Sequence, residues 1–482
     1  MRRGLKVNKK DGQNKVAMGN RRISIVGGLV ALTALTVGAG SYEPNWESLD
    51  RRPVAQWWVD AKFGIFVHWG PYAVPAYAPT SSDCINECYS EWYCGRVLRN
   101  EKNFADYHKA RYGRAPYANF AAQFTAENFD PKAWAELFRK AGAKYAVLTS
   151  KHHDGYALWP SPESAYYNSV VVGSGRDLAG EFTAAMKSAG LRSGFYYSLL
   201  EYANPFYPKN FLNNAQSQRW SMSEWSRRVN LPQMKELVVG YRPDILWTDG
   251  EWDFSDKEEL SEEFLAWLYN ESPVKDDVVV NDRWGKDCRG RHGGHYTTEY
   301  FDEGGDASGI SDEHPWEECR GIGRSFGFNR FENAEDYATR EKCIELLVSC
   351  VARGGNLLLN VGPTADGRIP VIMQDRLLAI GRWLAVNGEA IYGTRRWPRS
   401  SSLPKEKGVY YTQKGEAVYA IVFGERTGEV MLRGLGDRTA VRLLGSPRDV
   451  SFRTKGEDLV VDVPAGAIPG TTAYVFELRR EK

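Results

Sequence analysis

Features that would assign the chain to several common functional classes are missing from its 482 residues. No H-E-x-x-H or C-x-x-C spacing is present, which argues against the usual zinc sites. Residues 1–40 hold eight of the 62 basic residues but only one of the 61 acidic ones, so residues 41–482 carry a net charge of −6. A nucleic-acid-binding protein needs a clustered basic surface, so we expect no nucleic-acid partner.

Long apolar runs are also scarce. Arg21 and Arg22 precede an apolar run from Ile23 to Val37, and small residues follow it at positions 38–41. This order is typical of a secretory signal. The competing interpretation is a membrane anchor, but this run of 15 residues is shorter than the roughly 20 that a spanning helix needs. We predict a signal or targeting segment at residues 1–40, no membrane span in the mature chain, and a secreted, lysosomal or periplasmic location.

The cysteines suit an oxidising compartment better than a metal site. Seven are present, and Cys84, Cys88 and Cys94 crowd one polar segment. No matching pair of histidines follows them, so we expect one or two disulfides with a thiol left over. Asn270-Glu271-Ser272 is a single glycosylation sequon, which would make the chain a glycoprotein. We expect no cofactor.

Aromatic side chains, in contrast, are abundant. The chain has 16 Trp, 26 Tyr and 20 Phe, several of them beside Gly, Pro or charged residues. Aromatic faces stack on the apolar faces of sugar rings, which favours a carbohydrate ligand. Large hydrophobic cores also hold many aromatic side chains, so composition alone leaves both interpretations open.

Short apolar runs alternate with amphipathic segments between about residues 55 and 390. Asp130 and Pro131 are typical of a helix start, and apolar side chains between Trp134 and Ala141 recur at helical spacing. Asn333 is the predicted cap of a later helix that ends at Gly354-Gly355. The predicted strands are 63–69, 145–150, 192–198, 245–249, 278–282, 297–299, 325–328 and 356–361.

Repeated strand–helix units imply a parallel sheet, and about eight of them imply an α/β fold closed into a (β/α)8 TIM-like barrel. A doubly wound sheet is the alternative, but the first strand leads into His68-Trp69-Gly70-Pro71 rather than a glycine-rich phosphate loop. After about Trp397, short β-type runs separated by turns predict a C-terminal antiparallel β-sandwich. We predict a catalytic barrel over residues 41–395 and a sandwich over residues 396–482.

Four predicted strands end in polar side chains, which is unexpected for strands buried on both faces. A lone polar side chain is usually a loop cap or a satisfied core group. Four strand ends with the same pattern predict a functional site at that edge of the sheet. The polar strand ends are His68 and Trp69, then His152, His153 and Asp154, then Asp249 between Trp247 and Trp252, and finally Asp282 and Arg283.

Two chemistries fit these side chains. Histidine and aspartate are metal ligands, but His152 and His153 should point in opposite directions on an extended strand, so we predict no metal site. Glycosidic cleavage with retention needs a carboxylate that attacks the anomeric carbon and an acid that protonates the leaving oxygen. Asp249 is the predicted nucleophile, because Gly250 leaves room for a sugar ring and Trp247 offers a stacking wall.

Eight segments form an ordered series over about residues 50–395. They are Trp57–Gly70 (WWVDAKFGIFVHWG), Ser90–Tyr93 (SEWY), Ser150–Trp159 (SKHHDGYALW), Phe195–Ser198 (FYYS), Leu246–Trp252 (LWTDGEW), Asn281–Gly285 (NDRWG), Ser325–Arg330 (SFGFNR) and Asn356–Pro370 (NLLLNVGPTADGRIP). This series resembles the α-L-fucosidases of glycoside hydrolase family 29. The stretch between Tyr72 and Phe104, which carries three cysteines, departs from the family pattern and adjoins the predicted pocket.

The resemblance implies a retaining, exo-acting α-L-fucosidase. Such an enzyme removes terminal fucose from glycans, glycoproteins or glycolipids through a covalent fucosyl–aspartate intermediate. The residue matching the family's nucleophile is Asp249. The residues matching its substrate contacts are His68, Glu91, Trp92, His152, His153, Tyr197, Trp247 and Arg283.

The acid/base residue does not align cleanly with the family. Glu299, in T-T-E-Y, is the preferred candidate, and Glu317, in P-W-E-E, is the alternative. Two other functions stay open: a related α-L-glycosidase, such as an α-L-galactosidase, and a fucose-binding protein with impaired catalysis. A homo-oligomer is left open as well.

Overall fold

The computed structural model describes residues 41–82, 84–212, 219–303, 306–403, 407–424, 428–447, 449–463 and 472–480. The predicted signal segment at residues 1–40 lies outside these ranges. Among the described helices, none is long and apolar enough to cross a membrane.

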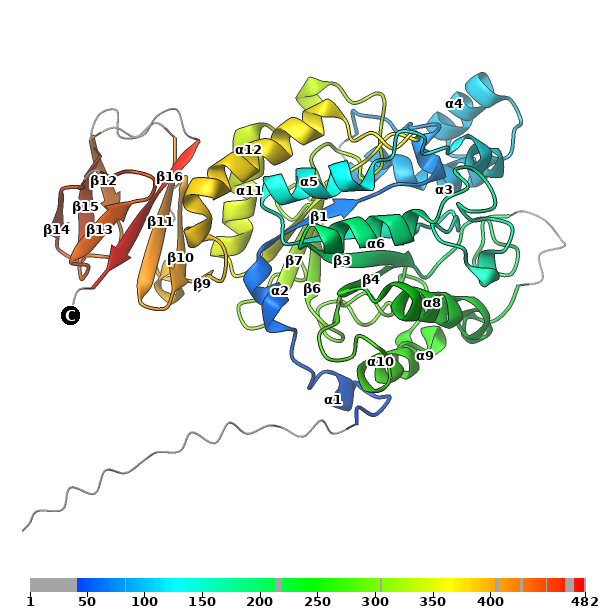
Figure 1. The fold of residues 1–482 in the computed structure, drawn as a ribbon, viewed down its shortest axis with the longest axis horizontal. Coiled ribbons are helices and arrows are strands. Elements are labelled where there is room, and N and C mark those ends of the chain that lie inside the picture. Colours follow the sequence, from blue (N-terminus) through cyan, green and yellow to red (C-terminus); the bar gives the residue numbers. More distant parts are fainter. Residues whose placement is uncertain are drawn as a thin grey trace, which may run out of the picture. The chain divides into compact units, whose positions relative to one another are not determined.

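Eight parallel strands form one curled sheet (Figure 1). Its order is β5-β4-β3-β2-β1-β8-β7-β6, which is the strand order of a barrel and confirms the predicted TIM-like fold. The outer strands β5 and β6 meet through the backbone N–H groups of Gly294 and His295, which donate to Asn281 and Val280 at 3.0 Å. The strands are β1 (Phe63–Val67), β2 (Tyr145–Lys151), β3 (Arg192–Ser198), β4 (Ile245–Asp249), β5 (Val279–Val280), β6 (Tyr296–Glu299), β7 (Trp316–Gly321) and β8 (Asn356–Val361).

Helices connect most of these strands. Within the described residues, no helix lies between β5 and β6 or between β6 and β7, so these connections are loops. The longer helices are α4 (Lys102–Tyr112), α5 (Pro131–Ala141), α6 (Leu178–Ser188), α8 (Leu231–Tyr241), α10 (Ser261–Asn270), α11 (Arg340–Ala352) and α12 (Val371–Asn387). The shorter ones are α1 (Trp46–Leu49), α2 (Gln56–Ala61), α3 (Tyr93–Leu98), α7 (Met222–Trp225) and α9 (Asp256–Glu259).

The strands are buried on both faces. Side chains alternate between the faces, so Phe66, Tyr196, Trp247 and Leu358 share one buried cluster inside the barrel. The other face packs against the helices, as Leu148 does. The next interior positions after Phe66 and Trp247, at the carboxyl ends of β1 and β4, are His68 and Asp249, two of the polar side chains predicted to form a site.

Two predicted elements were misplaced. The seventh strand is β7, not residues 325–328, because a strand reading Trp-Glu-Glu-Cys-Arg-Gly has no apolar run to reveal it. Its glutamates are nevertheless buried, because partners elsewhere in the barrel hydrogen-bond to them. Asn333 caps a single 3-10 turn, and α11 starts instead after its cap Thr339. The predicted start of α5 at Asp130 and Pro131 is confirmed, since Asp130 accepts from the N–H groups of Lys132 and Ala133.

Two antiparallel sheets follow the barrel, as predicted. Their orders are β13-β16-β11-β10-β9 and β12-β15-β14, and they share one apolar core. The first sheet also contacts α11, where the Tyr410 hydroxyl donates to Glu345 at 2.9 Å. In strand β14 all four side chains are exposed, so no buried apolar run marks this strand in the sequence. The strands are β9 (Arg395–Arg396), β10 (Val409–Lys414), β11 (Ala417–Phe423), β12 (Gly428–Leu432), β13 (Ala440–Leu443), β14 (Phe452–Lys455), β15 (Asp458–Val463) and β16 (Ala473–Arg479).

The expected disulfides are absent, because all seven cysteines carry free thiols. Cys343 and Cys350 illustrate why: both lie on α11, where a separation of seven residues is about 10 Å, beyond the roughly 7 Å that a disulfide can span. The sequon side chain of Asn270 is also engaged, since it accepts from and donates to the Tyr42 backbone at 2.8 Å.

Close packing of α12 on α5 depends on Gly381. A Cβ atom at this position would lie 1.9 Å from the carbonyl oxygen of Lys140. We expect Gly381→Ala to lower the free energy of unfolding by about 1–3 kcal/mol, because the helices must move apart. In the matched control Gly240→Ala, on α8, no atom lies within 4 Å of the new methyl group, and better helix propensity should raise stability by up to ~1 kcal/mol. Urea unfolding measures both; equal stability of the two variants would contradict this packing.

Candidate active site

A cavity of about 500 Å³ opens at the carboxyl ends of the barrel strands. This edge is where barrel enzymes carry their active sites. It has an aromatic wall and a polar floor. Its lining residues are Phe66, His68, Cys84, Ile85, Asn86, Tyr89, Glu91, Trp92, His152, Tyr196, Trp247, Asp249, Trp252, Arg283, Arg289, Glu299, Glu303, Asp306, Cys319 and Phe326.

Asp249 ends β4 and is held from both of its oxygens. Arg283 Nη1 donates to Oδ1 at 2.7 Å, and the Tyr196 hydroxyl donates to Oδ2 at 2.9 Å. Burial alone would raise the pKa of Asp249, but nearby positive charge, above all that of Arg283, outweighs it and lowers the pKa to about 2. The carboxyl group is therefore an anion at neutral and mildly acidic pH.

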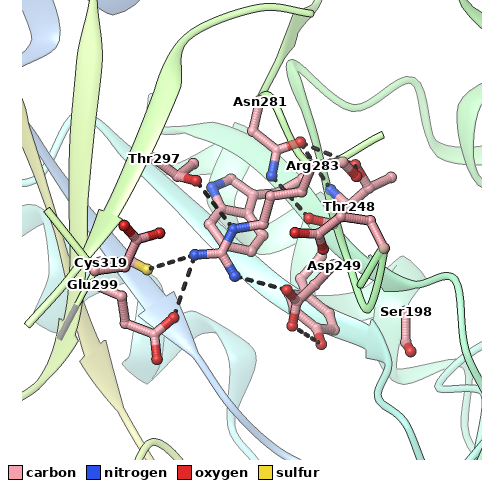
Figure 2. A network of polar contacts seen from close by, with 12 residues as sticks. Ser198, Thr248, Asp249, Asn281, Arg283, Thr297, Glu299 and Cys319 are labelled. Carbon is pink, nitrogen blue, oxygen red and sulfur yellow. Dashed lines mark hydrogen bonds and ion pairs between the residues drawn. The ribbon is translucent and has the colours of Figure 1, made fainter. Parts of the chain in front are cut away.

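Arg283 joins Asp249 to a second carboxyl group. Its Nη2 lies 3.3 Å from Glu299 Oε2, so the guanidinium sits between the two acids (Figure 2). Its Nε donates to Thr297 at 3.0 Å, and its Cζ lies 4.5 Å from the centre of the Trp247 ring. The other oxygen of Glu299 accepts from the Tyr89 hydroxyl at 2.6 Å. Two carboxyl groups from β4 and β6 thus share one buried cation.

Two histidines have tautomers fixed by their neighbours. Asn360 donates its amide N–H to Phe326, so its oxygen must accept from Nδ1 of His68, at 2.8 Å. Ser198 likewise donates to the carbonyl of Leu200, so its hydroxyl oxygen accepts from Nδ1 of His153, at 2.7 Å. In both rings Nε2 is then the unprotonated nitrogen.

Burial keeps these rings neutral. It lowers the pKa of His68 to about 3 and the pKa of His153 to about 4. Burial also lowers the pKa of His152 well below its usual value, and within the described part of the chain Nδ1 of His152 has no hydrogen-bond partner. Neutral rings with a free lone pair are suited to accept hydrogen bonds from ligand hydroxyl groups.

His152 and His153 do not point in opposite directions as expected. β2 ends at Lys151, so both lie in the turn that follows, with ring centres 4.2 Å apart. His153 Nε2 lies 3.5 Å from Asp249 Oδ2, although His153 does not line the cavity. Among the residues that the structure describes, no cluster of three side chains could hold a metal ion.

Glu91 and Trp92 line the cavity from a 3-10 turn of Ser90–Trp92. Glu91 is buried and accepts from the backbone of Gly327 at 2.8 Å and from the Ser325 hydroxyl at 3.2 Å. Burial raises the pKa of Glu91 to about 8, despite these hydrogen bonds. Ser325 lies in a G-R-S-F-G segment that matches the motif of serine hydrolases, but its hydroxyl bonds to Ser90 and Glu91 rather than to a histidine.

Besides His153, two predicted site residues do not line the cavity. Tyr197 points to the opposite face of β3, where its hydroxyl donates to Gln233 at 2.8 Å and accepts from Lys151 at 3.0 Å. Glu317 lies inside the barrel, where it accepts from Trp247 at 3.3 Å and from the Tyr145 hydroxyl. The remaining predicted residues, apart from His153, all line it.

Several cavity residues escaped prediction, among them Tyr89, Tyr196 and Arg289. Tyr196 had a usable signal, because strand alternation places it on the same face as its β4 partner Trp247. Tyr89 and Arg289 had none, since their partners lie far away in the sequence or in irregular loops.

A barrel whose carboxyl-end cavity holds an ionised carboxylate, a second carboxyl group and aromatic walls defines a glycoside hydrolase. Comparison with known proteins gives its family. A family model described as alpha-L-fucosidase matches residues 29–389. The tissue alpha-L-fucosidase of Bos taurus is 42% identical over 453 residues, which cover 91% of each chain. The alpha-L-fucosidase of Branchiostoma floridae is 39% identical over 451 residues, which cover 91% of this chain and 96% of that one.

Solved structures agree. The alpha-fucosidase of Thermotoga maritima in complex with fucose has a TM-score of 0.78 and 38% identity, covering 91% of this chain and 100% of that one. An alpha-L-fucosidase isoenzyme from Paenibacillus thiaminolyticus has a TM-score of 0.73 and 28% identity, covering 89% of this chain and 98% of that one. The chain belongs to the α-L-fucosidase family, and its expected resemblance to that family is confirmed.

The neighbouring tyrosines of β3 provide a matched pair of variants. Tyr196→Phe removes the hydroxyl that holds Asp249, so we expect kcat/KM for an aryl α-L-fucoside to fall about tenfold or more. Tyr197→Phe leaves Gln233 and Lys151 short of a partner on the other face. It should cost about 1–3 kcal/mol of unfolding free energy but change kcat/KM less than about twofold. Assays and urea unfolding measure both effects, and the reverse pattern would show that the two faces are misassigned.

Proposed function

We propose that the chain is a retaining, exo-acting α-L-fucosidase with Asp249 as nucleophile and Glu299 as acid/base. The observation that carries this proposal is the shared guanidinium: Arg283 contacts an ionised Asp249 and Glu299 in one cavity. A solved Thermotoga maritima α-fucosidase in the same family is described as bound to a mechanism-based inhibitor, which agrees with a covalent route in that enzyme. Glu317 is not favoured, because its carboxyl group is fully buried and does not reach the cavity.

In the first step an oxygen of Asp249 bonds to the anomeric carbon as the bond to the leaving oxygen breaks. Glu299, in its acid form, gives its proton to that oxygen, so the alcohol departs neutral. In the second step Glu299 takes a proton from water, whose oxygen attacks the anomeric carbon and releases Asp249 as a carboxylate. Two inversions at the same carbon give net retention.

The rest of the cavity binds the sugar. His68 lines the cavity with an unprotonated Nε2 atom, so it accepts a hydrogen bond from a fucose hydroxyl group. The aromatic wall contacts the methyl group that distinguishes fucose from galactose, and such a contact alone discriminates by roughly 1–3 kcal/mol. The main wall residues are Phe66, Tyr196, Trp247 and Phe326.

Relatives named tissue and plasma alpha-L-fucosidases support a secreted or lysosomal location. Export through residues 1–40 and the domain limits 41–395 and 396–482 remain predictions. The substrate class is a fucosylated glycan, and the aglycone is treated below.

Azide identifies the nucleophile through product stereochemistry. Asp249→Ala should lose at least ~10⁴-fold in kcat on an aryl α-L-fucoside, because the covalent route is gone. Azide should then occupy the space left by the carboxylate and attack directly, giving β-L-fucosyl azide, which NMR identifies. Near wild-type activity in a folded variant, or an α-configured azide product, would remove Asp249 from this role.

The same reagent separates the two acid/base candidates. Glu299→Ala should lose roughly 10²–10⁴-fold in kcat/KM, because no acid protonates the leaving oxygen. Azide should restore turnover by attacking the fucosyl–enzyme intermediate, giving α-L-fucosyl azide. Glu317→Gln, chosen to preserve the buried hydrogen bonds, should need no azide. If rescue occurs only in the Glu317 variant, the assignment of Glu299 is wrong.

A further inference from the structure

The outer part of the cavity carries side chains that the reaction does not use. Trp252 and Arg289 belong to loops that follow β4 and β5, and Asp306 lies in the loop that follows β6. All three line the cavity and are partly exposed, so they belong to its mouth. A fucose residue seated at Asp249 would direct its glycosidic oxygen, and whatever is attached to it, toward the proposed acid Glu299, whose backbone N–H donates to the carbonyl of Asp306 at 2.9 Å.

Arg289 is held rigidly in this mouth. Its Nε donates to Glu251 at 2.7 Å and its Nη1 to Asp306 at 2.6 Å. Its Nη2 lies 4.0 Å from Asp249 Oδ1, too far for a hydrogen bond, and has no hydrogen-bond partner among the described residues. One edge of a fixed guanidinium therefore faces the cavity with donors to spare.

Glu251 explains this rigidity. It is 1% exposed and lies two residues beyond Asp249, yet the proposed reaction assigns it no step. Its bond to Nε fixes the plane of the Arg289 side chain.

The loop that carries Arg289 is also anchored through its backbone. Asp282 accepts from the backbone N–H of Gly290 at 2.9 Å, and Gly290 adopts a φ of +64° that favours glycine. One buried carboxylate, Glu251, and one partly exposed carboxylate, Asp306, both bond to Arg289, which indicates that the position of this arginine matters.

Trp252 supplies an open aromatic surface in the same cavity as Arg289. The side chain is 40% exposed, although its ring centre lies 5.2 Å from that of His153 and 5.6 Å from that of Trp92. A partly exposed indole loses part of the free energy that full burial of its apolar surface would provide. A ligand stacked on the ring would bury that surface and recover this free energy.

We propose that Trp252 and Arg289 form a subsite for the sugar to which fucose is attached, and that this sugar is a neutral hexose or N-acetylhexosamine. This inference rests on the proposed function. The indole stacks on one face of the ring, and Nη2 of Arg289 donates to its hydroxyl or amide oxygens. Glu251 and Asp306 already balance the charge of Arg289, so the subsite offers no net positive charge to a carboxylated or sulfated sugar. Glu251 is a positioning residue that acts through Arg289.

Two substrates separate this subsite from the fucose site. α-L-Fucosyl fluoride has a single-atom leaving group and cannot occupy the subsite. The second substrate is whichever neutral fucosyl disaccharide, from a panel of α-1,2, α-1,3, α-1,4 and α-1,6 linkages, the wild-type protein cleaves fastest. The measured quantity is the ratio of kcat/KM for the disaccharide to kcat/KM for the fluoride, which cancels any effect of a variant on Asp249.

We expect this ratio to fall about tenfold or more in Trp252→Leu and in Arg289→Gln, as lost stacking or a lost charged hydrogen bond predicts. Glu251→Leu should reproduce the Arg289 defect, whereas Glu251→Gln keeps an oxygen for Nε and should stay near wild type. Arg291→Gln is the matched control, since Arg291 is exposed on the same loop and does not line the cavity; its ratio should not change.

The outcomes are distinct. An unchanged ratio in both Trp252→Leu and Arg289→Gln, with fluoride hydrolysis intact, overturns the subsite but leaves the proposed function standing. A wild-type preference for a carboxylated acceptor sugar over its neutral counterpart overturns the assigned sugar class. A wild-type protein that hydrolyses neither fucosyl fluoride nor any disaccharide overturns the proposed function, and the subsite with it.

Discussion

The contact of one guanidinium with two carboxyl groups is the interaction on which this site depends. Arg283 donates to Asp249 and to Glu299 from its two terminal nitrogens. In the proposed reaction Asp249 loses its negative charge when it bonds to the sugar, and Glu299 gains one when it releases its proton. Arg283 therefore has one negatively charged neighbour before this step, Asp249, and one after it, Glu299, and its guanidinium does not have to move. A buried charge that needs no reorganisation is an effective way to lower a barrier.

The barrel supplies this geometry through neighbouring connections. Asp249 ends β4, Glu299 ends β6, and Arg283 lies in the loop between β5 and β6, where no helix intervenes. That loop can turn inward because Gly294 approaches the carbonyl of Val280 so closely that a Cβ atom would lie 1.8 Å from it. Thr297 then accepts from Arg283 Nε and fixes the guanidinium plane. Irregular backbone at this one point of the barrel is what brings a cation between two strand ends.

Much of this arrangement could be predicted from the sequence, for reasons that also explain the failures. The role of Asp249 could be predicted from the sequence because a carboxylate is unexpected at the end of a strand that is otherwise apolar and buried. The sequence alone does not show whether Tyr196 or Tyr197 points into the barrel. The pairing of Tyr196 with Trp247 on β4 shows which of the two side chains faces the interior. The hydrogen bond from Tyr89 to Glu299 joins residues 210 positions apart, and no local pattern reports such a contact. Strand β7 was missed because its buried charges are satisfied only by tertiary partners.

The pH dependence of kcat/KM in Arg283→Gln tests the central claim most directly. Burial raises the pKa of Asp249, and Arg283 is the strongest of the opposing charges that lower it to about 2. Because Asp249 must be ionised to attack, the wild-type enzyme should not lose activity through this group until the pH falls to about that value. Without the cation the pKa rises, so the acidic limb of the profile should move to higher pH by about one unit or more. A variant whose acidic limb coincides with that of the wild type, whatever its rate, would contradict the account.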